Sequence, residues 1–409
     1  MASFQPETAL AYARALAYPR RVGSPGEAAA IAEIETRLAQ AGYEVERQPF
    51  EFSAGSQVAT TFEILLAQIL VLLTFWAWGA SAVLGMLPAL LLLGLLAGTG
   101  RLQRWVAAGS IAPPSGQTPT LWQRLCSRLG PRSQTVNIVG RLPGASAEPG
   151  PARGALPRLY LVAHSDSKSQ GLPLAARMTL IALAGLASVV FAVLTLLRPL
   201  WPALTSLAAL AGLAALLAGA PLLFLFLAGA GNVSPGALDN ASGAGLVLHL
   251  AETLAQGRPN VDFTILITGA EELGVVGATA FVLLAQRHGR LRHTDTGGAV
   301  SVLNFDGIGS DGRLAMVGGG GDNHLAALVR ASCVELRLPL GRLPLIGALF
   351  DHIPFAEAGC EALSLVTLGI AGRAVHTSAD TADKLHVEGF RQAGEVALRV
   401  IQKMAMRKT

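Results

Sequence analysis

The sequence predicts an α/β protein in which helices sandwich a mostly parallel sheet, together with four transmembrane helices arranged in two hairpins. Three observations lead to this class. Strand-like and helix-like segments alternate along much of the chain, which is typical of a parallel sheet. Two long runs contain almost no charged residue, which is typical of membrane spans. Polar residues that can bind metal follow several of the apolar strands.

The composition also favours membrane-embedded segments. Hydrophobic residues make up 52% of the 409 residues, and charged residues only 14%. The net charge of +4 comes from scattered basic residues that form no basic stripe, which argues against nucleic-acid binding. Cys126, Cys333 and Cys360 are too widely spaced for a metal motif or a disulfide framework, and they fit a reducing compartment. The N-terminus has no apolar run of signal-peptide length.

The first elements precede a long apolar run. "SPGEAAAIAEIETRLAQAGY" begins with a serine cap and a proline and closes at a glycine, which predicts a helix, and "EVERQPFEF" predicts a strand. Residues 64–100 contain no charged residue and are nearly twice as long as the roughly 20 residues that one span needs. A "GASAVLG" break divides the run, and Trp76 and Trp78 lie near it, as expected at a membrane interface.

The same pattern recurs over residues 178–230. Two uncharged runs flank Arg198-Pro199 and Trp201-Pro202, which predicts a second hairpin. The alternative is buried core helices, but the runs are too long for an ordinary core. We assign the chain as follows: hairpin 1 over residues 63–100, hairpin 2 over residues 177–230, and one soluble domain formed by residues 1–62, 101–176 and 231–409.

The charge distribution predicts which side of the membrane holds the soluble domain. A hairpin returns the chain to the side that it left, so all three soluble segments are expected on one side. Residues 101–177 contain ten lysines or arginines, whereas the two turns contain only Arg198. This bias predicts an integral, multi-pass membrane protein with its soluble domain on the cytoplasmic face.

The soluble remainder supplies the α/β pattern. Apolar, β-branched runs alternate with amphipathic segments of helical period. Strands are predicted over residues 158–166, 261–272, 299–309 and 361–369, and helices over residues 237–256, 274–289, 323–336 and 388–406.

Polar residues gather where these strands end. The set comprises His164, Asp166, Glu271, Glu272 and Asp306 directly after strands, Asp239 at a helix start, and His376 in a loop after a strand. Ligands bind at this edge of an open α/β sheet. Two histidines with several carboxylates form a ligand set for zinc or a similar divalent ion. Only one of the adjacent Glu271 and Glu272 needs to bind metal, so the other is free to hold a proton.

Each of these motifs also has an ordinary explanation when it is taken alone. A histidine can be satisfied in a core, and adjacent glutamates can stabilise a helix start. The metal-site hypothesis depends on all of them occurring at one edge of the sheet. Ser242 lacks the Gly-x-Ser-x-Gly context of a nucleophile, and the glycine-rich "MVGGGGDN" lacks the lysine of a phosphate loop.

Taken together, the motifs resemble family 28 of the metallopeptidases, the di-zinc aminopeptidases, to which glutaminyl cyclases are similar. The matching stretches are "VAHSDS", "PGALDNASGAG", "TGAEELGVVGA", "LNFDGIG", "FDHIPFAEAG" and "VHTSADTADKL". They extend over nearly all of the soluble chain. The resemblance implies a zinc-aminopeptidase sheet of the phosphorylase/hydrolase-like type, and the two hairpins are insertions in it.

The resemblance also implies a role for each metal ligand. His164 and Asp306 would bind one zinc ion, and Glu272 and His376 would bind the other. Asp239 would bridge the two ions, with a cis peptide bond to Asn240.

Other residues receive roles by the same resemblance. Glu271 would be the general base, and Asp166 would orient His164 through a hydrogen bond to its far nitrogen. Asp380 would act in a related way near His376. The remaining pair, Asp351 and His352, would lie at the rim and touch substrate.

These assignments predict a membrane-anchored zinc aminopeptidase. It would remove N-terminal residues from peptides with a free N-terminus, using a water held by two zinc ions and activated by Glu271. Its partners would be the peptide substrate and the lipid bilayer, and the hairpins would hold the site near the membrane surface. Two alternatives remain: a glutaminyl cyclase-like acyltransferase, and an inactive membrane scaffold of the same fold.

Overall fold

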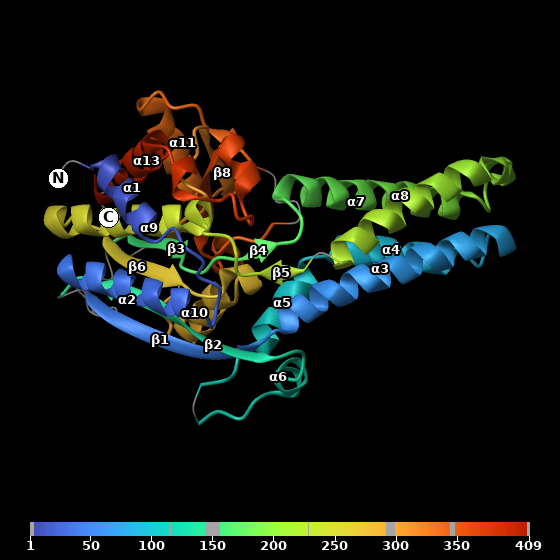
Figure 1. The fold of residues 1–409 in the computed structure, drawn as a ribbon, viewed down its shortest axis with the longest axis horizontal. Helices are drawn as coiled ribbons and strands as arrows, with labels where there is room; N and C mark the ends of the chain where they lie inside the picture. The colour runs from blue at the N-terminus through green and yellow to red at the C-terminus, as the bar shows by residue number, and fades with distance from the viewer. Residues whose placement is uncertain are drawn as a thin grey trace.

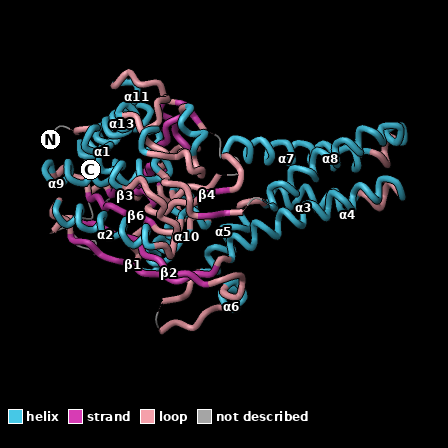
Figure 2. The backbone as a smooth tube through the Cα atoms, viewed as in Figure 1, coloured by secondary structure: helices cyan, strands magenta, loops and turns pink. Residues whose placement is uncertain are grey.

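The computed structural model describes residues 4–114, 116–143, 156–227, 229–291, 299–343 and 348–406. Two parts can be distinguished in Figure 1. The sheet domain contains the large β-sheet and the helices around it. The stalk consists of α3 (Gly55–Ala80), α4 (Met86–Gly98), α7 (Leu174–Leu197) and α8 (Ala208–Leu227). Figure 2 shows the stalk as almost entirely helical and projecting from one side of the sheet domain.

The central sheet has eight strands in the order β1-β2-β6-β3-β7-β10-β8-β9. The strands are β1 (Glu44–Ser53), β2 (Arg132–Arg141), β3 (Arg158–His164), β6 (Asp262–Thr268), β7 (Ser301–Phe305), β8 (Arg313–Gly318), β9 (Gly341–Arg342) and β10 (Glu361–Leu368). The four central strands β6, β3, β7 and β10 pair in parallel. Their nearly continuous burial matches parallel strands that are covered on both faces.

The flanks of the sheet differ from the mostly parallel sheet that the sequence predicts. β1 pairs with β2, β2 with β6, and β8 with β10, all antiparallel. The sheet is therefore mixed, with a parallel centre. The reason on one flank is the connection, because hairpin 1 leads the chain from β1 into β2 and no helix crosses the sheet between them.

Helices cover both faces of the sheet, as predicted. One face carries α1 (Pro6–Ala15), α2 (Pro25–Gln40), α9 (Ser242–Gly257), α11 (His324–Glu335) and α13 (Val387–Met406). The other face carries α10 (Val276–Arg287) and α12 (His352–Glu357). Phe281 and Phe355 from these two helices pack against Tyr160 of β3. Burial of such aromatic side chains contributes about 1.5–3 kcal/mol each.

The stalk packs with small residues inside and large ones outside. Seven of the thirteen buried residues of its core are alanines, which let the helices approach closely. Large aliphatic side chains such as Leu72 and Leu186 point outward and are 56% and 67% exposed. An exposed apolar surface of this extent marks contact with a partner or a membrane.

Three helical segments of the stalk are long and apolar enough to span a membrane, namely α3, α7 and Pro202–Leu227, which contains α8. The fourth predicted span differs from expectation. α4 is only 13 residues long, and after it the chain bends by 62° into α5 (Arg101–Ser110). At about 1.5 Å per residue, α4 alone is shorter than the roughly 30 Å hydrocarbon core.

A short ribbon joins the stalk to the sheet domain. β4 (Ser169–Gln170) pairs antiparallel with β5 (Ala230–Gly231), and these two strands flank α7 and α8 in the chain. The arrow of β6 in Figure 1 points toward the stalk. The carboxyl ends of the parallel strands therefore face the base of the stalk.

Candidate metal centre

The centre is assembled from the carboxyl ends of the four central strands. His164 is the last residue of β3, Glu271 and Glu272 follow β6, Asp306 follows β7, and His376 follows β10. Because these strands are parallel and adjacent, their ends meet at one edge. The sixth residue, Asp239, lies just before α9, and its peptide bond to Asn240 is cis.

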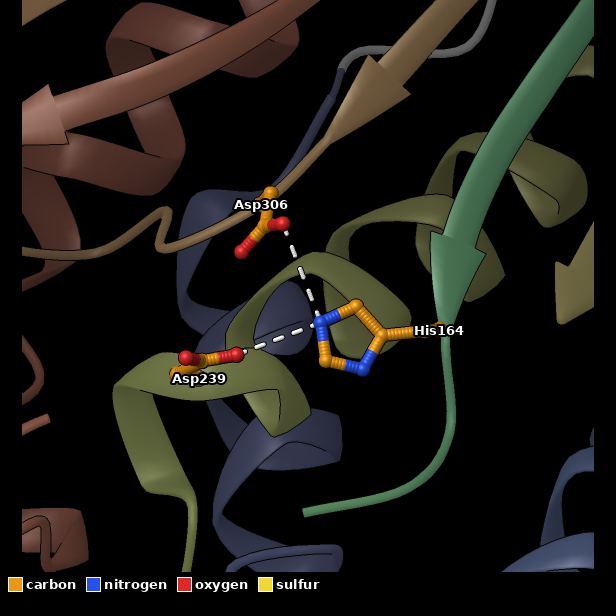
Figure 3. Close-up of side chains that lie close together, drawn as sticks. All are labelled: His164, Asp239 and Asp306. Atoms are coloured by element: carbon orange, nitrogen blue, oxygen red, sulfur yellow. Dashed lines mark ion pairs between the residues drawn. The ribbon is translucent and has the colours of Figure 1, made fainter. Parts of the chain in front are cut away.

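Five of these side chains form two groups that share one member. His164, Asp239 and Asp306 make the first group, and Asp239, Glu272 and His376 make the second, with the donor atoms of each group within 4.8 Å of one another. Figure 3 shows the first group, in which Nε2 of His164 points toward both aspartates.

The shared aspartate offers one oxygen to each group. Oδ1 of Asp239 lies 3.2 Å from Nε2 of His164, and Oδ2 lies 3.0 Å from Nε2 of His376. Asp306 Oδ2 lies 3.7 Å from Nε2 of His164, and Glu272 Oε1 lies 3.2 Å from Nε2 of His376. This division of the two oxygens is the arrangement that a carboxylate bridging two ions requires.

The donor atoms fit a bound cation. Within the described residues, Nε2 of His164, Nε2 of His376 and Oε1 of Glu272 are buried without a hydrogen-bond partner. Leaving buried polar atoms without partners is costly, and a metal ion would satisfy all three. Imidazole nitrogens with carboxylate oxygens form a donor set that suits zinc.

The adjacent glutamates have opposite electrostatic environments. Oε2 of Glu272 forms an ion pair with Nζ of Lys168 at a distance of 2.7 Å. Burial acts to raise the pKa of Glu272, but His376 and Lys168 outweigh it and lower that pKa. For Glu271, burial raises the pKa well above its usual range, and the neighbouring carboxylates add to the rise against the effect of His164. Glu272 is thus held as a carboxylate, whereas Glu271 has a high proton affinity.

The same competition sets the charge of the bridging position. Burial acts to raise the pKa of Asp239, but the adjacent His164 and His376 hold it well below its usual range. The pKa of Asp306 is raised by burial and by the nearby Asp239. Asp239, the shared carboxylate, is therefore the most strongly anionic residue of the two groups.

Asp166 is buried next to His164, although its contacts differ from those predicted. Its main-chain carbonyl oxygen, at 3.1 Å, is the hydrogen-bond partner of Nδ1 of His164, whereas its carboxylate lies 3.5 Å from that nitrogen. The carboxylate oxygens accept hydrogen bonds from the main-chain N–H groups of Glu271 at 3.1 Å and Glu272 at 3.2 Å. Asp166 therefore anchors the turn that carries both glutamates.

Asp380 likewise supports a different residue from the one predicted. Its carboxylate accepts hydrogen bonds from the main-chain N–H of Leu238 at 2.7 Å and of Asp239 at 3.2 Å, so it fixes the bridging aspartate and not His376. Burial raises the pKa of Asp380 to about 6.

The prediction that Asp351 and His352 lie at the rim is wrong. Asp351 is fully buried and accepts a hydrogen bond from the hydroxyl of Thr268. His352 is 2% exposed, and its Nδ1 lies 2.7 Å from the Ser364 hydroxyl. Both residues belong to the beginning of α12, which packs against β10 and β7, and this packing removes them from the surface.

Two residues of the site were not singled out from the sequence. Lys168 directly follows the "VAHSDS" motif, two residues beyond Asp166, and this position was the available signal. Arg20 is 1% exposed, and it donates hydrogen bonds to the carbonyl oxygens of Ser165 at 2.9 Å and Gly236 at 3.0 Å. It thereby ties the end of β3 to the segment before Asp239. Burial lowers its pKa to about 10.

The fold and the donor atoms define a class, namely α/β proteins with a shared-carboxylate metal centre at the strand ends. A family model described as Peptidase family M28 matches residues 224–401. The resemblance to family 28 of the metallopeptidases is confirmed over this part of the chain, which contains most of the candidate metal donors.

The chain is also similar in sequence to an aminopeptidase. The chain is 25% identical over 178 residues to "Aminopeptidase YwaD" of Bacillus subtilis (strain 168), which covers 41% of this chain. The match spans only 37% of the length of that relative.

Solved structures share the fold. "BSAP, a zinc aminopeptidase from Bacillus subtilis" aligns with a TM-score of 0.55 at 15% identity, covering 98% of this chain and 96% of that chain. The glutaminyl cyclase of Fimbriiglobus ruber aligns with a TM-score of 0.53 at 16% identity, covering 98% and 95%. At these identities the likeness establishes the fold alone.

Proposed function

We propose that the protein is a membrane-anchored, zinc-dependent aminopeptidase that hydrolyses N-terminal residues of peptides. The observation that carries the proposal is the pair of donor groups that share Asp239, with the carboxylate of Glu271 beside them. The family match over residues 224–401 and the aminopeptidase relative support the same reaction.

His164 and Asp306 would hold one zinc ion, Glu272 and His376 would hold a second, and Asp239 would contribute to both. When bound, such ions polarise the scissile carbonyl and stabilise the negative charge that develops on its oxygen. Lys168 pairs with Oε2 of Glu272, and the carboxylate of Asp166 accepts the main-chain N–H of Glu272, so Oε1 of Glu272 stays directed at His376. Asp380 holds the main chain of Asp239.

Glu271 would move the proton in this reaction. Its Oε2 lies 3.8 Å from Nε2 of His164, and no lysine or arginine forms an ion pair with it among the described residues. Glu271 would accept the proton of the attacking water and deliver it to the leaving amine. Its neighbour Glu272 is paired with Lys168 and cannot take this part without losing that ion pair.

The stalk supports the membrane part of the proposal. Its outward face is apolar, and three of its helices have the length of a span. The ribbon at its base reaches the centre, because the main-chain N–H of Gln170 donates to the carbonyl oxygen of His376 at 2.9 Å. The site would therefore face the bilayer surface. The ten basic residues in segment 101–177 favour the cytoplasmic side.

The function is tested with detergent-purified protein that is loaded with zinc and given a mixed pool of short peptides. Mass spectrometry compares the products of wild type with those of Glu271→Gln. We expect free N-terminal amino acids from wild type and none from the variant. Loss of water or ammonia without cleavage would instead identify a cyclase. Zinc binding without any new product would favour the inactive scaffold.

A further inference from the structure

The bend after α4 changes the direction of the chain at the base of the stalk. α5 leaves the line of α4 by 62°, so if α4 enters the bilayer, α5 runs much closer to the membrane plane than along its normal. α6 (Leu121–Cys126) packs beside α5, and Figure 1 shows both where the stalk meets the sheet domain.

The two helices are joined by an aromatic pair. The rings of Trp105 and Trp122 stack with their centroids 3.7 Å apart, and Nε1 of Trp122 donates to the carbonyl oxygen of Trp105 at 3.2 Å. Ala107, on the inner side of α5, is buried against the sheet domain, and Val106 is buried against Ala59 of α3 and Cys126 of α6. The α5–α6 unit therefore has one face fixed to the protein and another face left open.

The open face is apolar, aromatic and basic. Trp105, Leu121 and Leu125 are 58%, 74% and 50% exposed. The exposed Arg101, Arg124 and Arg128 lie on the same two helices or directly after them. A tryptophan and leucines at the membrane boundary, flanked by arginines, form the composition of an interfacial amphipathic surface.

The charged residues of this segment all have one sign. Residues 101–134 contain five arginines and no aspartate or glutamate. Arg104 is neutralised by an ion pair with Glu357 at 2.7 Å, which leaves Arg101, Arg124, Arg128 and Arg132. Basic residues beside a span are attracted to anionic lipid headgroups, whose own charge is negative.

We propose that the exposed face of the α5–α6 unit docks on the bilayer surface and takes anionic phospholipid headgroups. The apolar tips of Trp105, Leu121 and Leu125 enter the interface, and the arginines contact lipid phosphates. This inference rests on the proposed insertion of the stalk. It adds a second, lateral contact, which fixes the tilt of the sheet domain so that the metal edge faces the membrane.

The test uses the full chain in liposomes of phosphatidylcholine, with or without phosphatidylserine. Single cysteines that carry a spin label replace Leu121, Leu125 and, as a control, Val334, which is 77% exposed. Val334 belongs to α11, a helix that lies away from the stalk in Figure 1. A label at Leu72 of α3 reports on stalk insertion. The wild-type chain, whose three cysteines are buried, gives the background. Collision with oxygen and with a water-soluble nickel complex measures the depth of each label.

We expect the Leu121 and Leu125 labels to favour oxygen in liposomes that contain phosphatidylserine, while the Val334 label favours nickel. If the Leu121 and Leu125 labels favour nickel as the Val334 label does, while the Leu72 label lies in hydrocarbon, the docking proposal is wrong. The patch would then be a contact surface for another protein. A Leu72 label in water would overturn the membrane anchoring itself, and the docking with it.

The contribution of the exposed arginines to docking is tested with a matched pair of double variants. Arg124→Gln/Arg128→Gln removes two exposed arginines of the patch, and Arg330→Gln/Arg337→Gln removes two exposed arginines of the distant α11 region. We expect the first variant to lose the difference in Leu121 depth between the two lipid mixtures, and the second to keep it. Equal behaviour of the two variants would exclude anionic headgroups as the ligand.

Discussion

The sheet domain and the stalk bury opposite kinds of side chain. The sheet domain encloses large aliphatic and aromatic residues, and it also buries charged groups that pair with one another at the metal centre. The stalk encloses mainly alanine and turns its leucines outward. This difference fits the proposal that the stalk lies in lipid, because burial of large apolar surface stabilises packing in water but not in lipid.

The largest expected effect concerns the carboxylate that both donor groups share. Asp239→Ala removes one oxygen from each group, so binding of both ions should fall and peptide hydrolysis should drop to background. Zinc content measured by elemental analysis checks this without an activity assay. Asp322→Ala, at an exposed aspartate, is the control. Full zinc content in the Asp239 variant would contradict the shared site.

The next effect separates the adjacent glutamates. Glu271→Gln keeps the shape of the side chain but cannot accept a proton, so kcat should fall by about 10²–10⁴-fold. Zinc content should not change, because Glu271 is not among the donors of either group. Steady-state kinetics with elemental analysis measure both quantities, with the exposed Glu44→Gln as control. A variant that loses zinc would show Glu271 to be a ligand.

A smaller effect is expected at Lys168, which holds Glu272 at 2.7 Å. Loss of a partner that orients a ligand typically costs about 10–100-fold in metal affinity. Lys168→Met should weaken zinc binding to that extent in competition with a chelator, and Lys168→Arg should restore most of it. Equal affinity of wild type and the methionine variant would mean that Lys168 does not position Glu272.

The stalk offers two neighbouring positions with opposite expectations. Ala187 is 8% exposed and faces the helix core, whereas Leu186 is 67% exposed. Ala187→Leu overfills the core and should destabilise the protein by about 1–3 kcal/mol. Leu186→Ala should change stability by about 0.5 kcal/mol or less. Thermal unfolding in detergent compares them, and a larger loss from Leu186→Ala would reverse the inside–outside assignment of the stalk.

A further expected effect is a pH dependence of stability in the sheet domain. Burial raises the pKa of Cys333 and of Cys360 from the ordinary 9.0 to about 11. Between these pH values the unfolded chain has lost thiol protons that the folded chain keeps, so stability falls as the pH rises from about 9 to about 11. Alkylation at pH 9 should be slow in the native protein and fast in denaturant. Equal rates would show that the two thiols are accessible.

The sequence predicted much of this architecture because the relevant signals are local. Apolar, β-branched runs marked β3, β6, β7 and β10, and the absence of charge over tens of residues marked the stalk. Strand ends in a parallel sheet share one edge, so the approach of His164 to Asp306 and of Glu272 to His376 follows from topology. Each of these inferences needs only nearby residues and a general rule.

The tertiary structure decided what depends on contacts between distant segments. Asp239 faces His164 with one oxygen and His376 with the other only because the segment before α9 is fixed by Asp380, 141 residues away in the chain. Burial of Asp351 depends on how α12 packs, and the bend after α4 on how α5 packs on the sheet domain. Sequence by itself therefore determined which residues gather at the ends of the parallel strands and which segments form long apolar helices. Folding decided which groups these residues pair with. Hydrogen bonds and ion pairs depend on distances of a few ångströms between segments that are far apart in the chain, and a local sequence pattern does not contain those distances.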